Sequence, residues 1–184
     1  PADTFRIALL GDSFAFGWGV QEEESFAFAL EQNLNRIFEG KVRFEVLNFG
    51  VPGYSTFQEV QAFMQKGMCF NPDAVLVYFV QNDFGLPFFV RDIRGEKSEG
   101  LFSALEFARL TWNAANPDAQ EELAKMQGWD PNSSLKRLAE FLAERGLPLF
   151  VAINPRKSQK MDISRLSSIR KRPGVTIIDL RTGL

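Results

Sequence analysis

The sequence contains no histidine, only one cysteine and no long apolar run. A serine nucleophile usually passes its proton to a histidine, so this absence bears on any hydrolytic chemistry. Cys69 cannot form a disulfide within the chain, and its apolar neighbours favour a small buried thiol. No run approaches the roughly 18 apolar residues of a membrane-spanning helix, and no signal peptide is recognisable. The cellular compartment therefore stays open.

An excess of charge is also lacking. Lys and Arg number 21 and Asp and Glu number 23, which gives a formal net charge of -2. Nucleic-acid binding needs clustered basic residues, so nucleic acid is not expected as a partner. Hydrophobic residues at 45% and charged residues at 24% are typical of a folded globular chain. At 184 residues, we expect a single domain with a core of ordinary size.

Short apolar runs alternate with amphipathic segments along most of the chain. This alternation predicts an α/β fold with a parallel five-stranded sheet covered by helices on both faces. A helical insertion at about 84–127 interrupts it. The expected strands are 5–10, 42–47, 74–80, 147–153 and 175–180, and the expected helices are 24–38, 56–68, one starting at 130 and 162–172. A capping box of Thr56 and Glu59 is expected to open the second helix.

The last predicted strand lies very near the end of the sequence. It is apolar enough to need cover on both faces, yet only Arg181 to Leu184 follow it. We therefore expect the natural domain to continue beyond Leu184 with a final helix. The chain also starts at Pro1 rather than Met, which is compatible with an upstream segment.

Polar or small residues follow the first three predicted strands. Parallel sheets bind ligands at the carboxyl ends of their strands, which directs attention to Ser13, Gly53 and Asn82. A serine at such a turn can expose its Oγ and its backbone N–H together. A glycine lets the backbone approach an oxyanion, and an asparagine amide can donate to the same atom. Each residue also fits a plain structural role as a turn or cap residue, so the interest lies in the combination.

The stretches Gly-Asp-Ser-Phe at 11–14, Asn-Phe-Gly-Val-Pro-Gly at 48–53 and Gln-Asn-Asp at 81–83 resemble the first three conserved blocks of the SGNH (GDSL-type) hydrolase family. RIALLGDSFAFGWGV and VLNFGVPGYST resemble a bacterial branch of it, whose members are often exported or membrane-tethered. The resemblance implies a flavodoxin-like three-layer α/β/α sandwich. It also implies hydrolysis of esters or thioesters, or acyl transfer, without metal or organic cofactor. By the same resemblance, Ser13 is the nucleophile and first oxyanion donor, Gly53 a backbone donor and Asn82 a side-chain donor.

The sequence departs from the family pattern in several places. Phe14 replaces the commoner Leu, and Val80 stands where many members have Gly. The Asp-x-x-His block that follows the fifth strand in the family is absent. Asp179 lies within the fifth predicted strand and is not followed by a histidine, so we interpret it as a strand-end polar residue. The resemblance therefore implies an Asp and a His beyond Leu184, without which the 184 residues are expected to be nearly inert toward esters.

Two other functions remain open. A non-catalytic protein of the same fold would keep the cleft to bind a carbohydrate or an acyl group. A flavodoxin-like flavin or nucleotide binder would share the fold class as well. Against the second, no glycine-rich phosphate-binding motif follows the first strand, and Asp12 would repel a phosphate there.

Phenylalanine is abundant, with 19 Phe against 2 Tyr. Most of these side chains should lie in the core, because Phe offers a large apolar area without a polar group. A few are candidates for the wall of a substrate pocket that holds an acyl chain near Asn82, namely Phe14, Phe84, Phe88 and Phe89. The alternative is that most of them pack the insertion onto the core.

Overall fold

The computed structural model describes residues 3–84, 125–154 and 166–180. Within these ranges the chain forms one five-stranded sheet in which every neighbouring pair of strands is parallel. The strand order is β2-β1-β3-β4-β5, the flavodoxin-like order. The predicted fold class is therefore confirmed. The strands are β1 (Thr4–Gly11), β2 (Arg43–Asn48), β3 (Ala74–Phe79), β4 (Leu149–Ile153) and β5 (Val175–Asp179).

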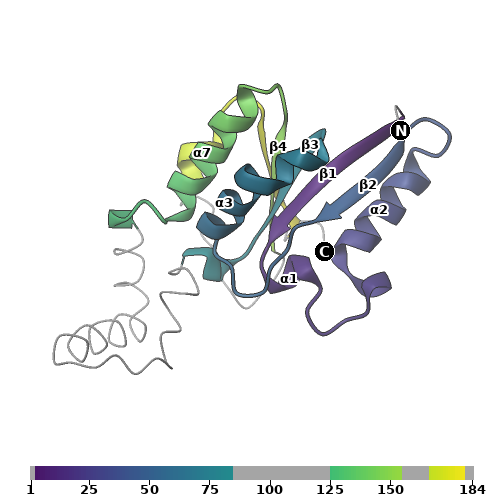
Figure 1. Cartoon of the computed structure of the whole chain (residues 1–184), viewed down its shortest axis with the longest axis horizontal. Coiled ribbons are helices and arrows are strands. Elements are labelled where there is room, and N and C mark those ends of the chain that lie inside the picture. The colour runs from purple at the N-terminus through teal and green to yellow at the C-terminus, as the bar shows by residue number, and fades with distance from the viewer. Residues whose placement is uncertain (1–2, 85–124, 155–165, 181–184) are drawn as a thin grey trace.

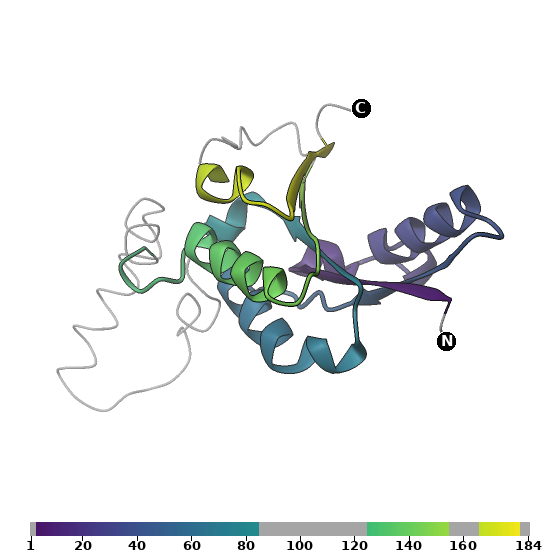
Figure 2. The ribbon, with the colours of Figure 1, turned by 90° about the horizontal axis from the view of Figure 1, so that it is seen from above.

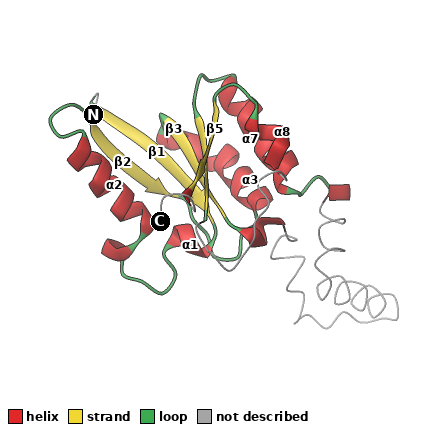
Figure 3. Ribbon diagram, turned by 180° about the vertical axis from the view of Figure 1, so that it is seen from behind, coloured by secondary structure: helices red, strands yellow, loops and turns green. Residues whose placement is uncertain are grey.

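Helices cover both faces of this sheet. Helices α3, α7 and α8 lie on one face and α2 lies on the other, beside β2 (Figures 1 and 3). Figure 2, seen from above, shows the strands between these two groups. The helices are α1 (Ser13–Phe16), α2 (Phe26–Ile37), α3 (Thr56–Lys66), α7 (Pro131–Ala143) and α8 (Ser167–Arg170), with 3-10 turns η1 (Glu22–Glu24), η2 (Gly67–Phe70) and η3 (Gln81–Phe84).

The side chains of the strands alternate between two apolar layers, as the two-residue period of a strand requires. Ala8 and Leu10 of β1 face the α3 and α7 side, where Phe63 and Leu138 complete the larger cluster. The smaller cluster, on the α2 side, contains Leu9, Leu76, Tyr78, Val80 and Ala27. At β5, Ile178 stays 39% exposed. The core is therefore densest around β1 and β3, the strands whose ends carry Ser13 and Asn82.

The positions of the five strands agree with the sequence prediction to within two residues at each end. The helix predicted at 24–38 is real but begins later, because η1 occupies its first residues. Of the helix predicted at 162–172, only the part from residue 166 onward is described. Nearly all of the predicted insertion at 84–127 lies outside the described residues.

Two local predictions were wrong. The N-cap of α3 is Ser55, whose N–H donates to Oε1 of Gln58 (3.2 Å), so Thr56 is the first helical residue and Glu59 turns inward. Cys69 is exposed, not buried. It lies in η2, where the Phe63 ring packs against Gly67 and occupies the inward side of that turn.

None of the helices in the described ranges is long and apolar enough to span a membrane.

Candidate active site

The carboxyl ends of β1 and β3 form the centre of the candidate site. The chain leaves β1 toward β2 on one side and later returns to β3 on the other, so a crevice is expected between these two strand ends. Ser13 follows β1, Gly53 lies in the loop after β2, and Asn82 lies in η3 directly after β3. All three residues singled out from the sequence thus lie at one edge of the sheet, beyond three adjacent strands.

Ser13 is the first residue of α1, a helix of only four residues. Asp12 caps this helix, and its Oδ1 accepts a hydrogen bond from the Phe14 N–H (2.9 Å). The Ser13 carbonyl accepts from the N–H groups of Gly17 and Trp18, at 3.2 and 2.9 Å, where Gly17 ends the helix with φ of 87°. Ser13 itself is half-buried. Its backbone is thus held by hydrogen bonds on both sides, which fixes the position of this turn.

Two glycines allow α1 to pack tightly between its neighbours. A Cβ on Gly11 would lie 2.6 Å from the Cβ of Ala15 and 3.2 Å from the Tyr78 carbonyl oxygen. A Cβ on Gly50 would collide with the backbone nitrogen of Phe16 and lie 2.8 Å from the carbonyl carbon of Ala15. Contacts below 3.0 Å cannot be tolerated without a shift of the chain. The Ser13 turn is therefore fixed by backbone packing against β3 and against the loop after β2.

The loop after β2 remains hydrogen-bonded to β1. The Phe49 N–H donates to the Leu9 carbonyl (2.8 Å), and the Val51 N–H donates to the Gly11 carbonyl (3.0 Å). Gly53, two residues further on, has φ of 82°, a conformation that favours glycine. This accounts for the glycine in conformational terms, and its expected role as an oxyanion donor stays a prediction.

Asn48 joins this loop to the serine turn. Its Nδ2 donates to the Ala15 carbonyl (2.9 Å), and its Oδ1 accepts from the Gly50 N–H (2.9 Å). The side chain thus connects the last residue of β2 to both α1 and the loop that leads to Gly53.

We expect Asn48→Ala to lower the free energy of unfolding by about 1 kcal/mol, because two hydrogen bonds are lost at a partly exposed position. Asn48→Asp should cost at least as much, since a second acceptor would then face the Ala15 carbonyl. Urea denaturation measures both. Asn33→Ala is the control, because its side chain also makes two hydrogen bonds but only within α2, to Ala29 and Arg36. Equal loss of ester turnover in the Asn33 and Asn48 variants would contradict a link between Asn48 and the site.

The segment after β3 is closed by Asp83. Its Oδ2 accepts from the Val80 N–H (2.7 Å), and its own N–H donates to the Val80 carbonyl (3.2 Å). Asn82 lies inside this closed turn, and the structure describes its backbone position but not its side chain. Val80, the departure from the family pattern, is buried in the apolar layer on the α2 side. Its larger side chain therefore fills core space.

Three buried carboxyl groups lie behind the site, contributed by Asp12, Glu59 and Asp83. Burial raises the pKa of Glu59 well above its ordinary value, and the neighbouring Asp83 and Asp12 raise it further. Burial also raises the pKa of Asp83 to about 8, against the opposing hydrogen bond from Val80. Sequence reasoning gave Glu59 and Asp83 no role in the site. A signal was present for Glu59, which lies four residues before the buried Phe63 and so on the inward stripe of α3.

A cavity of about 470 Å³ opens beside Ser13. Its wall includes Phe14, Trp18 and Phe26, and the last of these packs against Tyr78 with ring centroids 4.8 Å apart. The cavity is lined by Ser13, Phe14, Gly17, Trp18, Val20, Glu24, Ser25 and Phe26. The structure thus brings the candidate Phe14 to the serine, and the walls combine aromatic rings with a carboxylate and hydroxyl groups.

The other pocket candidates do not join this cavity. Phe84 is only 7% exposed and packs edge-on against Phe79, with ring centroids 5.4 Å apart, so the structure places it in the core rather than in a pocket wall. Its position at the end of η3 places the ring in the larger apolar cluster. Phe88 and Phe89 lie outside the described residues.

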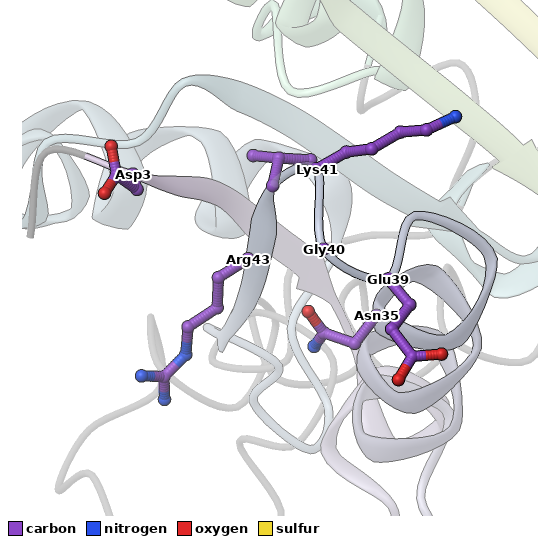
Figure 4. A pocket seen from close by; sticks show the side chains of 7 residues that line it. Asp3, Asn35, Glu39, Gly40, Lys41 and Arg43 are labelled. Atoms are coloured by element: carbon purple, nitrogen blue, oxygen red, sulfur yellow. The ribbon is translucent and has the colours of Figure 1, made fainter.

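A second cavity, of about 400 Å³, lies at the opposite edge of the sheet, where β2 begins. The side chains of Glu39, Lys41 and Arg43 point in different directions around it (Figure 4). No set of groups converges on one point, so this cavity offers no reactive centre. In the part of the chain that the structure describes, no group of three or more His, Cys, Asp or Glu residues is arranged to hold a metal ion.

No protein-family model and no curated protein matches the sequence. Among solved structures, the chain is similar to an acetyl xylan esterase, AlAXEase (TM-score 0.59, 17% identity, covering 97% of this chain and 79% of that one). It is also similar to a two-domain esterase active on acetylated mannans, with a TM-score of 0.58 and 14% identity. This match covers 97% of this chain and 38% of that one.

A protein of the G-D-S-L family from Desulfitobacterium hafniense is a third such structure, with a TM-score of 0.54 and 15% identity. This match covers 96% of this chain and 81% of that one. The chain spans 58% of the length of AlinE4, an SGNH-hydrolase family esterase with 18% identity, a TM-score of 0.47 and 81% of this chain covered. The three structures with TM-scores of 0.54 to 0.59 establish that the chain shares the α/β fold of the two esterases and of the G-D-S-L family protein.

Proposed function

We propose that the protein is an SGNH-type ester hydrolase with Ser13 as its nucleophile. The observation that carries this proposal is the placement of Ser13, Gly53 and Asn82 beyond three adjacent strand ends, with Ser13 lining a cavity. The esterase fold neighbours support the same reaction class. Turnover of p-nitrophenyl acetate by the full-length protein, and its loss in Ser13→Ala, tests the proposal.

The proposed reaction has two halves. The Ser13 Oγ attacks the ester carbonyl while its proton moves to a base, and the resulting oxyanion accepts hydrogen bonds from the N–H groups of Ser13 and Gly53 and from the Asn82 amide. Collapse of this intermediate breaks the bond to the alkoxy oxygen, which leaves as the alcohol after taking the proton. Water then attacks the acyl-serine in the same way and releases the carboxylic acid. In acyl transfer, a second alcohol replaces the water.

The base is the part of this mechanism that the 184 residues do not supply as a histidine. The buried carboxyl groups are poor substitutes. Asp12 already caps α1, and Glu59 and Asp83 are turned into the protein. The proposal therefore places the catalytic Asp and His in a segment beyond Leu184.

For the substrate, the cavity beside Ser13 favours the ester of a carbohydrate. Trp18 is 72% exposed, although an indole ring of this size usually buries most of its surface. It lies in a tilted arrangement with Phe16, with ring centroids 6.2 Å apart, and forms a flat apolar surface at the cavity rim. The C–H face of a sugar ring can pack on such a surface while its hydroxyl groups donate to the exposed carboxylate of Glu24. Two of the fold neighbours are esterases of acetylated xylan and mannan, which supports this substrate class.

We expect Trp18→Ala to raise KM for an acetylated xylo-oligosaccharide about 3- to 10-fold, the equivalent of roughly 0.5–1.5 kcal/mol of lost aromatic contact. The value of kcat for p-nitrophenyl acetate should stay close to wild type, because this small ester does not need the sugar surface. The stability should also change little, since the indole is exposed. Steady-state kinetics on both substrates measures the split, and an unchanged KM for the oligosaccharide would contradict the assignment.

A non-catalytic binding protein is the second candidate, and the absence of histidine from the 184 residues favours it. Under this alternative, the protein binds acetylated oligosaccharide at the same cavity without turning it over. Calorimetry combined with an assay for released acetate separates the two functions.

A further inference from the structure

Each of the three buried carboxyl groups belongs to a different segment of the proposed site. Asp12 directly precedes Ser13, Asp83 directly follows Asn82, and Glu59 lies in the first turns of α3, the helix that begins three residues after Gly53. Asp12 and Asp83 are each 1% exposed and Glu59 is 3% exposed. The carboxyl cluster, defined as Asp12, Glu59 and Asp83, thus lies where the three site segments meet below the surface.

Several carboxyl oxygens of the cluster receive no hydrogen bond from the residues that the structure describes. Asp12 accepts from Phe14, and one oxygen of Asp83 accepts from Val80. Both oxygens of Glu59 and the other oxygen of Asp83 have no partner that meets hydrogen-bond geometry among the described residues. Ionised carboxylates only accept, so two of them can bond to each other only if one carries a proton. A buried charge without a partner is costly, and a shared proton removes that cost.

No cation compensates for the cluster from the described elements packed around it. The groups that act on Glu59 and Asp83 electrostatically are acidic, and Thr56 adds polar contacts to Asp83. On α7, which packs against α3, the charged side chains Lys136, Arg137 and Glu140 are exposed. Asp130, at the start of that helix, accepts from the Ser133 N–H as its N-cap. The apolar strand β3 contributes no charge.

We propose that Glu59 and Asp83 are positioning residues of the ester-hydrolase site, which share a proton within the carboxyl cluster and so hold α3 and η3 together beneath Ser13. This inference rests on the proposed function for its meaning, but the shared proton can be tested without it. A proton held between Glu59 and Asp83 removes one of two neighbouring buried charges, and so stabilises the packing of the start of α3 against the turn that carries Asn82.

The expected pH dependence follows from the direction of the pKa shifts. The unfolded-state pKa of an aspartate is about 4, whereas that of Asp83 in the folded protein is about 8. Between these values the folded protein holds protons that the unfolded chain has released, so the free energy of unfolding falls as pH rises through this window. The contribution is fully present below about pH 4 and is lost as pH rises through 8. Glu59 acts in the same direction.

The test compares the full-length wild type with Glu59→Gln, which keeps the shape of the side chain and removes its titration. We expect the wild-type Tm to fall by at least about 5 °C from pH 5.5 to pH 9, and that of Glu59→Gln to fall less than half as far. Glu140→Gln on the exposed face of α7 is the matched control and should follow the wild type. If the Tm values of the wild type and of Glu59→Gln fall equally between pH 5.5 and pH 9, the proposal is overturned.

Hydrogen exchange adds a readout that a general loss of stability would not produce. In the wild type, the protection factors of the backbone amides in residues 11–16, 51–59 and 80–83 should fall together by roughly tenfold between pH 7 and pH 9. These factors are corrected for the pH dependence of the intrinsic exchange rate. In Glu59→Gln the protection should persist. A uniform loss of amide protection across all five strands would instead indicate a merely structural role and overturn the proposal.

If Glu59→Gln does not fold, infrared spectroscopy of the wild type decides. A carbonyl band of protonated carboxyl groups that persists at pH 7 and disappears by pH 9 supports the shared proton, and its absence at pH 7 overturns it. Activity is measured separately. If the wild type turns over no ester at any pH, the proposed function fails, while the Tm and infrared results still decide on the shared proton.

Discussion

Replacing Ser13 with alanine is expected to lower kcat for p-nitrophenyl acetate by about 10⁴- to 10⁶-fold in the full-length protein. The substitution removes the atom that forms the acyl-enzyme, and only binding and oxyanion stabilisation remain. Because Ser13 is half-buried and its turn is held by backbone contacts, the free energy of unfolding should change by less than about 0.5 kcal/mol. Steady-state kinetics and urea denaturation measure the two quantities.

Ser133→Ala is the matched control, because this serine is exposed on α7 and does not line the cavity beside Ser13. It should retain full turnover. The 184 residues without any following segment should be nearly inert, since members of a catalytic triad act as a unit. Rapid turnover by these 184 residues that Ser13→Ala abolishes would show that they contain a base and would contradict the proposed origin of the histidine. Turnover that survives Ser13→Ala would contradict the nucleophile itself.

The second large effect is expected at Gly50, where alanine should lower the free energy of unfolding by about 3 kcal/mol. The added methyl group would meet the backbone of Phe16 and Ala15, and backbone cannot turn away as a flexible side chain can. The clash can be relieved only by moving α1 away from the loop after β2. Because α1 carries Ser13, turnover should fall at least tenfold even in conditions where the variant is fully folded.

Gly146→Ala separates this steric effect from the cost of an unusual backbone conformation. Gly146 has φ of +67°, and a methyl group added there would have no atom within 4 Å. Alanine should therefore cost only about 1 kcal/mol at this position, the penalty of a left-handed conformation. Its turnover should match the wild type. Urea denaturation and kinetics on the folded variants test both expectations. If the Gly50 and Gly146 variants lose the same stability and activity, close packing of α1 on the loop is not what positions Ser13.

The fold could be predicted from the sequence because its strands are buried on both faces. A run such as 74–80 is apolar throughout and ends at polar residues, and β3 keeps all six of its residues buried. The alternation of such runs with amphipathic segments left few topologies for a chain of this length. The position of the candidate site followed, since parallel strands align their carboxyl ends at one edge.

What the sequence pattern missed depends on contacts between segments. Whether Thr56 or Ser55 caps α3 is decided by how the chain leaves the loop after β2, and this choice also turns Glu59 inward. Charged residues are normally solvent-exposed, so nothing local distinguished Asp83 from a surface acid, and for Glu59 the one signal was its spacing from Phe63 on the inward stripe of α3. Cys69 was assigned to the core from its apolar neighbours, yet the Phe63 ring already fills the inward side of its turn.

The hydrogen bonds from Phe49 and Val51 to β1 also bear on the cost of binding a substrate. They extend the pairing between β1 and the chain beyond the last residue of β2, so the loop that leads to Gly53 is ordered before any ligand arrives. A loop that must be ordered on binding loses conformational entropy at that moment and weakens the complex. Here that loss is already included in folding, so under the proposed function the interaction energy of a bound ester can go into stabilising the oxyanion instead.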